Sequence, residues 1–353
     1  MSTATISPVT ARADAFVAAR LPEARALAAR LVPLVELPDT FVSELEAGLE
    51  SLADATYLDE LRRMTPGMSE AFGVRTPLTR PIHTAVRRAC RGRPDVALWV
   101  AERVEREPYF EVRAIACTLL RISLEADPER SWQLVRRMAR AADSWVAVDI
   151  LAGVAALGIL IEPFRWAELE QLTYSPSPWE RRFVGSTIAT LPFEVVPEDR
   201  ERLAPRPALD LLGQLIGDAD QNVQKALAWA LRSWARVDPT GVGQFLDVEA
   251  RRSADEADGN RAWVVRDALP AVAPAEAARL RTIVAGIRRV PGAPGTSAAS
   301  RAAAAFADLI ATGTTNPIPR FEAAGPAGAA APTAASLETA GPRAHEPERS
   351  LPE

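Results

Sequence analysis

The stretch Trp145–Ile161 is an apolar run that contains a single charged side chain, Asp149. An ionised carboxylate in apolar surroundings is costly unless it is paired, so this residue needs an explanation. On a helix, Trp145 and Asp149 share one face with three small residues, Ala152, Gly153 and Ala156. The pattern predicts a concave wall onto which Trp145 and Asp149 face. The alternative is a core helix whose Asp pairs with an Arg from a neighbouring helix.

A second stretch, residues 221–236, carries a polar and aromatic stripe at helical spacing. The stripe consists of Gln221, Lys225, Trp229, Arg232 and Arg236, and the apolar residues Val223, Leu227, Leu231 and Trp234 lie opposite it. A Trp between cations on the face away from the core is unusual, because a large aromatic side chain normally favours burial. Such a Trp is either part of a binding site or lies on the surface beneath an Arg in a cation–π contact.

The expected helix at 178–190 places one long cation, Arg182, among the small residues Gly185, Ser186 and Ala189. A guanidinium fixed in such surroundings suits a phosphate oxygen. The alternative is that Arg182 is the partner of Asp149, in which case the two form an interhelical salt bridge.

Two runs of arginine contain no acidic residue. The first lies between Glu70 and Asp95 and holds Arg75, Arg80, Arg87, Arg88, Arg91 and Arg93; the second lies between Glu129 and Asp143 and holds Arg130, Arg136, Arg137 and Arg140. A charge run is usually a solvated face. In a chain of net charge −5, however, these runs could follow a phosphate backbone.

Composition excludes several classes of function. The net negative charge is not that of a general nucleic-acid binder, so binding must rest on local arginine stripes. Cys90 and Cys117 lie in helical apolar patterns and indicate buried free thiols. With two histidines in the whole chain, we expect neither histidine-based catalysis nor a metal or other cofactor. No signal peptide or membrane span is evident, so we expect a cytoplasmic protein.

Along the chain, helical patterns alternate with short Pro, Gly or Asp punctuation, and no strand pattern is convincing. We expect helices near 40–52, 55–64, 79–91, 94–106, 109–125, 129–141, 145–160, 178–190, 207–216, 221–236, 240–257, 260–270 and 274–288. Ser177-Pro178-Trp179-Glu180 has the pattern of a capping box and Asp127-Pro128 that of a helix start, while Pro22 could break or kink an N-terminal helix over 11–34. Trp145, Arg182 and Trp229 recur on successive segments at the spacing of HEAT-type helix pairs, which predicts an all-α, curved solenoid. We divide the chain into an N-terminal helical extension (1–38), a repeat domain (39–290) and an Ala/Gly/Pro-rich tail (291–353). In that tail, 297–311 could form a helix and 313–353 should be disordered.

Within these elements, three segments resemble one known family. They are SWVAVD (144–149), SPWERR (177–182) and QNVQKALAWALRSWAR (221–236), with AFGVRTP (71–77) upstream. Together they resemble the DNA alkylation repair glycosylases built from HEAT-like repeats, the AlkD-like family, from Phe41 to about residue 290. Trp145 and Asp149 match the family's Trp-x-x-x-Asp. Arg182 matches its phosphate-binding Arg, and Trp229 matches its second active-site Trp.

The resemblance implies excision of cationic N3- and N7-alkylpurines from duplex DNA without base flipping. Asp149 would then face the anomeric carbon of the sugar, with Trp145 and Trp229 along the deoxyribose and backbone. We expect Lys225, Arg232 and Arg236 to contact DNA. Val146 stands at a position where the family often has an acidic residue, so Asp149 is the only carboxylate on its helix. This difference affects the expected range of substrates more than the expected reaction.

Such chemistry suits these residue types. Glycosidic cleavage passes through a cationic sugar that a fixed carboxylate stabilises, and an alkylated purine leaves without a general acid. We therefore expect a monofunctional, monomeric enzyme that acts on alkylated duplex DNA, at the nucleoid when bound to it, and that contacts no membrane. The competing hypothesis is a non-catalytic HEAT-like scaffold that binds DNA structure or protein partners and has no need of Asp149.

Overall fold

The computed structural model describes residues 8–311. The chain forms two compact units, Met1–Asp308 and Leu309–Glu353, and the features below belong to the first. The predicted disorder of 313–353 lies outside the described residues. Every regular element in the described part is a helix, as an all-α fold requires, and it contains no strand.

The α-helices are α1 (Pro8–Leu31), α2 (Pro38–Ser51), α3 (Ala55–Met64), α4 (Thr76–Ala89), α5 (Pro94–Val104), α6 (Phe110–Ser123), α7 (Pro128–Ala141), α8 (Trp145–Ile161), α9 (Arg165–Gln171), α10 (Pro178–Thr190), α11 (Pro205–Leu215), α12 (Gln221–Trp234), α13 (Pro239–Asp255), α14 (Gly259–Ala268), α15 (Pro274–Ile283) and α16 (Ala298–Ala311). Single turns or short runs of 3-10 helix are η1 (Val32–Leu34), η2 (Leu172–Tyr174), η3 (Leu191–Phe193), η4 (Pro197–Arg202) and η5 (Leu269–Ala271).

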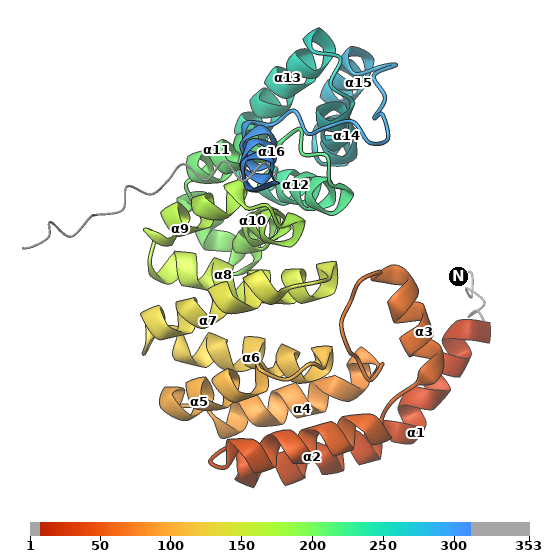
Figure 1. Ribbon diagram of the computed structural model, residues 1–353, viewed down its shortest axis with the longest axis vertical. Helices are drawn as coiled ribbons and strands as arrows, with labels where there is room; N and C mark the ends of the chain where they lie inside the picture. The colour runs from red at the N-terminus through yellow and green to blue at the C-terminus, as the bar shows by residue number, and fades with distance from the viewer. Residues whose placement is uncertain (1–7, 312–353) are drawn as a thin grey trace, which may run out of the picture. The chain divides into compact units, whose positions relative to one another are not determined.

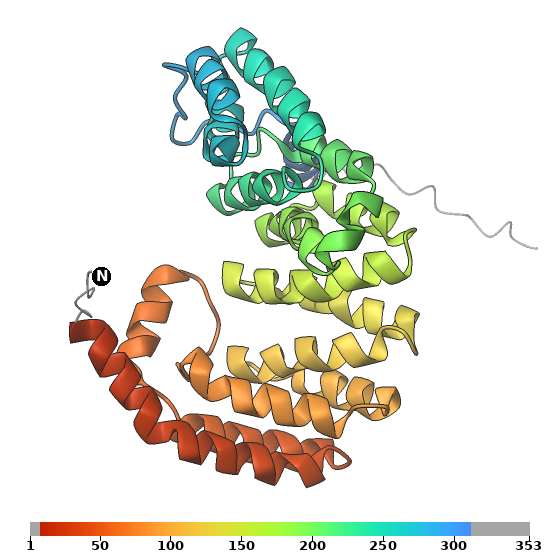
Figure 2. The same cartoon turned by 180° about the vertical axis from the view of Figure 1, so that it is seen from behind.

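These helices stack in two layers. In one layer α1, α4, α6, α8, α10, α12 and α14 each contact the next, and in the other α2 contacts α5, while α13 contacts α15 (Figures 1 and 2). Helices of the two layers also pair across the stack, as α5 does with α6, α7 with α8 and α13 with α14. This is the arrangement of a helical-repeat solenoid. Trp145, Arg182 and Trp229 therefore lie on three successive helices of one layer, as their spacing predicted.

Close packing within and between the layers depends on small residues at the contacts. A Cβ at Gly185 of α10 would come within 2.9 Å of the Ala226 Cβ and 3.2 Å of its backbone on α12. A Cβ at Gly158 of α8 would meet the ring of the buried Trp132 at 2.9 Å. The apolar stripe of α12, including Val223, Leu227 and Trp234, is buried as predicted.

Two predicted helix starts had different outcomes. The Asp127 carboxylate accepts a hydrogen bond from the Arg130 backbone N–H at the start of α7, which confirms the predicted cap. At Ser177 the predicted helix start is correct, but the hydrogen bonds of the predicted capping box do not form. Ser177 is the N-cap of α10, but its side chain makes no capping bond, and Glu180 instead accepts from the Ser175 hydroxyl.

The N-terminal helix continues without a break through Pro22, where a break or kink was conceivable. Leu27 and Leu31 on it are fully buried in the core that α2 and α4 share. Cys90 and Cys117 are buried free thiols, as predicted, and burial raises the pKa of the Cys90 thiol to about 11 and that of Cys117 to about 12. None of the helices in the described part has the length and apolar character that a membrane crossing requires.

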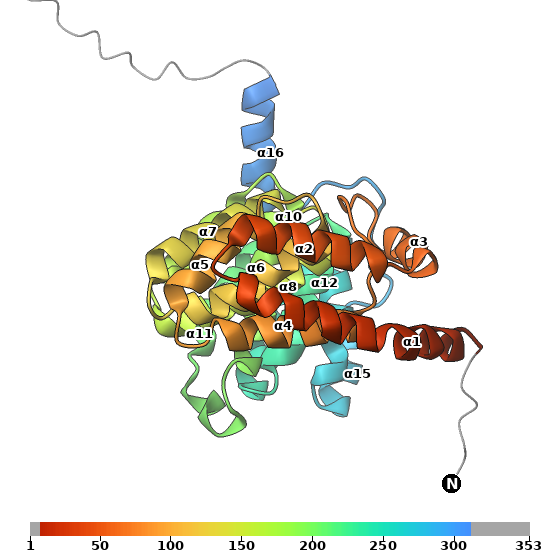
Figure 3. The same ribbon diagram turned by 90° about the horizontal axis from the view of Figure 1, so that it is seen from below.

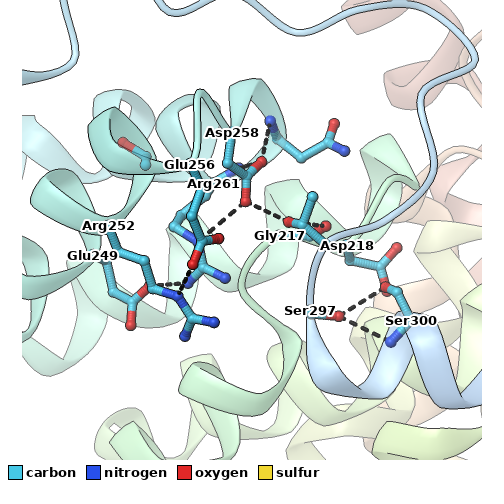
Figure 4. A network of polar contacts seen from close by, with 12 residues as sticks. Gly217, Asp218, Glu249, Arg252, Glu256, Asp258, Arg261, Ser297 and Ser300 are labelled. Carbon is cyan, nitrogen blue, oxygen red and sulfur yellow. Dashed lines mark hydrogen bonds and ion pairs between the residues drawn. The ribbon is translucent and has the colours of Figure 1, made fainter.

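A polar network connects residues 294–300 to the loops that precede α12 and α14 (Figure 4). The Thr296 backbone N–H donates to the Gly217 carbonyl at 2.9 Å, and its hydroxyl donates to Asp258. Asp258 also caps α14 and pairs with the buried Arg261, which in turn pairs with Glu249. Residues 294–300 thus pack on the α12–α14 region. The division into extension, domain and tail remains a prediction.

Candidate functional site

Asp149 lies on α8 and is held by side chains of α10. Arg182 donates to it twice, from Nε to Oδ1 at 3.2 Å and from Nη2 to Oδ2 at 2.7 Å. The Ser186 hydroxyl donates to Oδ1 at 2.7 Å. Three hydrogen bonds from the adjacent helix therefore fix the orientation of the carboxylate.

Burial within this pair is unequal. The Arg182 side chain is 6% exposed and that of Asp149 is 22% exposed. Arg182 also donates from Nη1 to the Asn222 carbonyl at 2.6 Å, which ties α10 to α12. The alternative that the sequence left open, an interhelical salt bridge, is thus the arrangement that the structure has. The carboxylate, rather than the guanidinium, is the more exposed member of the pair.

The wall of small residues predicted beside Asp149 was wrong. Ala152, Gly153 and Ala156 are buried in the helix packing, where a Cβ at Gly153 would lie 3.2 Å from Glu194 Oε1. The side chains that line an open cavity beside Trp145 are instead Val146 and Ile150. The apolar run has too little polar contrast for its periodicity to show which face meets a neighbour.

Trp145 lines a cavity of about 580 Å³ walled by α3, α4, α6 and α8. Its indole Nε1–H donates to the Met64 carbonyl at 3.1 Å, at the end of α3. The wall from α4 is polar and comprises Thr76, Thr79, Arg80, His83, Thr84 and Arg87. Trp145 is therefore oriented by a segment far away in the sequence, and its ring faces an open space rich in hydrogen-bond donors.

The loop that follows α3, residues 65–75, is fixed at several points. The Glu111 carboxylate of α6 accepts from the backbone N–H groups of Phe72, Gly73 and Val74 at 3.0, 2.8 and 3.1 Å. Asp143, just before α8, accepts from the Ser69 N–H at 2.8 Å. These contacts connect α3 and its loop to the helices that carry the cavity wall. The Met64 carbonyl that binds the Trp145 indole therefore belongs to a segment that Glu111 and Asp143 fix in place.

His83 projects from α4 into this cavity wall, and its Nδ1 lies 2.7 Å from the Thr118 hydroxyl. Desolvation lowers the pKa of His83 from 6.5 to about 4. Between these two values the unfolded chain binds a proton that the folded chain does not, so the free energy of unfolding falls as pH drops from about 6.5 to about 4. We expect His83→Gln to lose less stability than the wild type between pH 7 and pH 5 in urea unfolding. An equal loss in both proteins would contradict this.

Trp229 lies on α12 in a second cavity of about 350 Å³, which Phe193, Arg232, Arg236 and Pro270 also line. Trp229 is half-buried. Arg236 stacks over the Phe193 ring, 5.6 Å from its centroid, so this arginine makes its cation–π contact with Phe193 and not, as one of the two alternatives would have it, with Trp229. Trp145 and Trp229 thus line different cavities.

The predicted DNA-contacting cations differ in their availability. Arg232 donates to both the carbonyl and the carboxylate of Asp267, at 2.8 and 2.5 Å. Arg236 and Lys225 are exposed, and neither makes an ion pair with a carboxylate among residues 10–305. Lys225 and Arg236 therefore keep an uncompensated charge, whereas that of Arg232 is largely neutralised.

The sequence did not identify several residues of the site. Ser186 was noted only as a small neighbour of Arg182, although its hydroxyl binds Asp149. Glu111 gave no signal, because one Glu in an amphipathic helix is usually solvated. Within the described residues no group of three or more His, Cys, Asp or Glu could hold a metal ion.

Comparison with known proteins adds one finding to this geometry. A family model described as DNA alkylation repair enzyme matches residues 45–270, a range that contains Trp145, Asp149, Arg182 and Trp229. A search of curated proteins finds no match to the chain.

Proposed function

Because this chain belongs to the family of DNA alkylation repair enzymes, we propose that it is a monofunctional DNA glycosylase for cationic N3- and N7-alkylated purines in duplex DNA. The observation that carries the proposal is the Asp149 carboxylate, which Arg182 and Ser186 fix while it stays the more exposed member of its ion pair. A preorganised anion at the surface of the stack is what a cationic sugar requires for stabilisation.

The proposed reaction breaks the bond between C1′ of the sugar and the purine nitrogen. The electron pair of that bond leaves with the base, which becomes neutral because it was cationic before. The positive charge passes to the sugar, where Asp149 stabilises it until water adds to C1′ and loses a proton. No general acid is needed, and the base stays in the duplex without flipping.

The other site residues have supporting roles in this proposal. Trp145 and Trp229 present electron-rich faces to the cationic sugar and base, at about 0.5–2 kcal/mol each. Lys225, Arg232 and Arg236 contact the phosphates, Lys225 and Arg236 with the more available charge. For Arg182 we propose a positioning role rather than the phosphate contact expected from the sequence, because its donors already hold Asp149 and the Asn222 carbonyl.

The proposal predicts a selectivity based on the charge of the lesion. Incubation with methylated duplex DNA should release free 3-methyladenine and 7-methylguanine, while uracil in a matched duplex should stay in place. A neutral base is a far poorer leaving group in a site without a general acid. Chromatography of the released bases measures both outcomes. Robust release of uracil would contradict the mechanism, and no release of either methylated base would contradict the function.

A monofunctional enzyme forms no covalent bond to the sugar. A Schiff-base nucleophile would need a desolvated lysine, and the only lysine in the chain, Lys225, is exposed. Borohydride added during the methylated-DNA reaction should therefore trap no protein–DNA adduct. An adduct that disappears in Lys225→Ala would overturn the monofunctional assignment.

A further inference from the structure

The two arginine runs that look alike in the sequence differ in the structure. On α7, Arg130, Arg136, Arg137 and Arg140 pair with Glu102, Glu168, Glu105 and Glu180 respectively, at 2.7 to 3.8 Å. On α4, Arg80, Arg87 and Arg88 are exposed, and no carboxylate whose side chain the structure describes lies within ion-pair distance of them. The α7 run is therefore a neutralised face, whereas α4 presents net positive charge.

The charge of α4 continues onto α1. An open groove of about 520 Å³ lies between the two helices, which run side by side (Figure 3). Arg25 of α1 and Arg80 and Arg88 of α4 line it, and the rest of its lining is Ala, Pro and Thr. Arg25 is likewise exposed and without an ion pair in the described part of the chain. The groove thus has three cations and no acid.

This groove is continuous with the cavity beside Trp145. Arg80 and Thr84 line both of them, so that one cationic strip runs from the Trp145 cavity across α4 to α1. Arg25 lies outside the range that the family model matches, 45–270. The groove is therefore a feature that this chain builds with its own N-terminal helix.

We propose that the α1–α4 groove binds the sugar–phosphate backbone of duplex DNA to one side of the lesion. Exposed guanidinium groups at several points along an open groove match the repeating charge of a phosphate backbone. Apart from one Thr, the side chains between them are Ala and Pro, which offer no hydrogen bonds to base edges, so we expect the contact to be made with the backbone and to depend little on sequence. Its position relative to the lesion rests on the proposed function, whereas the phosphate contact itself does not.

The test is the salt dependence of binding to an unmodified duplex of about 30 base pairs, measured by fluorescence anisotropy. Removing one arginine that binds a phosphate should reduce the slope of log Kd against log salt by about 0.9. The double variant Arg25→Ala/Arg88→Ala should therefore show a slope smaller by about 1.8, and binding at low salt weaker by about tenfold or more. The double lysine variant keeps both charges and should retain the wild-type slope.

Arg130→Ala/Arg137→Ala on α7 is the matched control, because it removes two arginines whose charges are already paired. It should leave the slope unchanged. An unchanged slope in Arg25→Ala/Arg88→Ala, or an equal fall in the control, would overturn the proposal. If the wild type releases no base at all, the proposed function fails while the salt slope still tests the groove.

Discussion

Asp149→Asn is expected to lower the excision of 3-methyladenine by about a hundredfold or more, the scale of losing one preorganised electrostatic group. The substitution keeps the size and most of the shape of the side chain, so Arg182 and Ser186 can still donate to its carbonyl oxygen. It removes the negative charge that the proposed mechanism places opposite the sugar cation. Single-turnover release of base at saturating protein measures the effect on the chemical step alone.

DNA binding separates this result from a loss of fold. Asp149→Asn should bind duplex DNA at least as tightly as wild type, because a carboxylate near the phosphates repels them. Glu102→Gln is the matched control. It also neutralises a carboxylate paired with an arginine, but between α5 and α7, and it should excise normally. Full activity in Asp149→Asn would contradict the mechanism and favour the scaffold hypothesis.

Arg182→Ala should both destabilise the protein and lower its activity. The truncation leaves Asp149 without its cation and the Asn222 carbonyl without a donor, at the contact between α8, α10 and α12. Breaking a fully buried pair costs about 3–5 kcal/mol, and because Asp149 is partly exposed we expect about 2–3 kcal/mol here. Denaturant unfolding measures the stability. Excision per folded molecule should fall at least tenfold, because the carboxylate loses its fixed orientation.

The neighbouring Arg181 provides the control for stability. Arg181 lies beside Arg182 on α10 and pairs with the buried Asp218, ahead of α12, at 2.7 Å, and it does not touch Asp149. Arg181→Ala should therefore lose stability of similar size while keeping its excision rate per folded molecule. If both variants lose activity in proportion to stability alone, Arg182 has only a structural role. A stable Arg182→Ala protein would show that the pair contributes little to the fold.

The helices could be predicted from the sequence because their signals are local. The helices at 55–64 and 178–190 were predicted with the bounds that α3 and α10 have, since each begins and ends at a distinct change of pattern. The seven-residue α9 was missed, because two turns are too short for a periodicity to show. Stacking in two layers followed from the repeat spacing. Much of the fold was thus predictable from patterns within single helices.

Partnerships in the site were harder to predict, because they join residues far apart in the chain. The sequence placed Asp149 and Arg182 on neighbouring helices and left their pairing open as one of two outcomes. It could not show that Arg232 meets Asp267, 35 residues away, or that Met64 receives the Trp145 indole N–H, 81 residues away. Nor could it distinguish the paired arginines of α7 from the unpaired ones of α4. Both runs hold several arginines and no acidic residue, and what differs is the carboxylates that the neighbouring helices bring to them.

The polar network at residues 294–300 spans two neighbouring repeats. Thr296 bonds to the Gly217 carbonyl ahead of α12 and to Asp258 ahead of α14, and Asn260 bonds to the Pro294 carbonyl (Figure 4). Because these bonds reach the starts of two helices from different repeats, the segment acts as a non-covalent cross-link that resists sliding of α12 against α14. Shortening the chain at residue 290 should therefore lower the free energy of unfolding, while Asp149 and Arg182, on α8 and α10, keep their contacts.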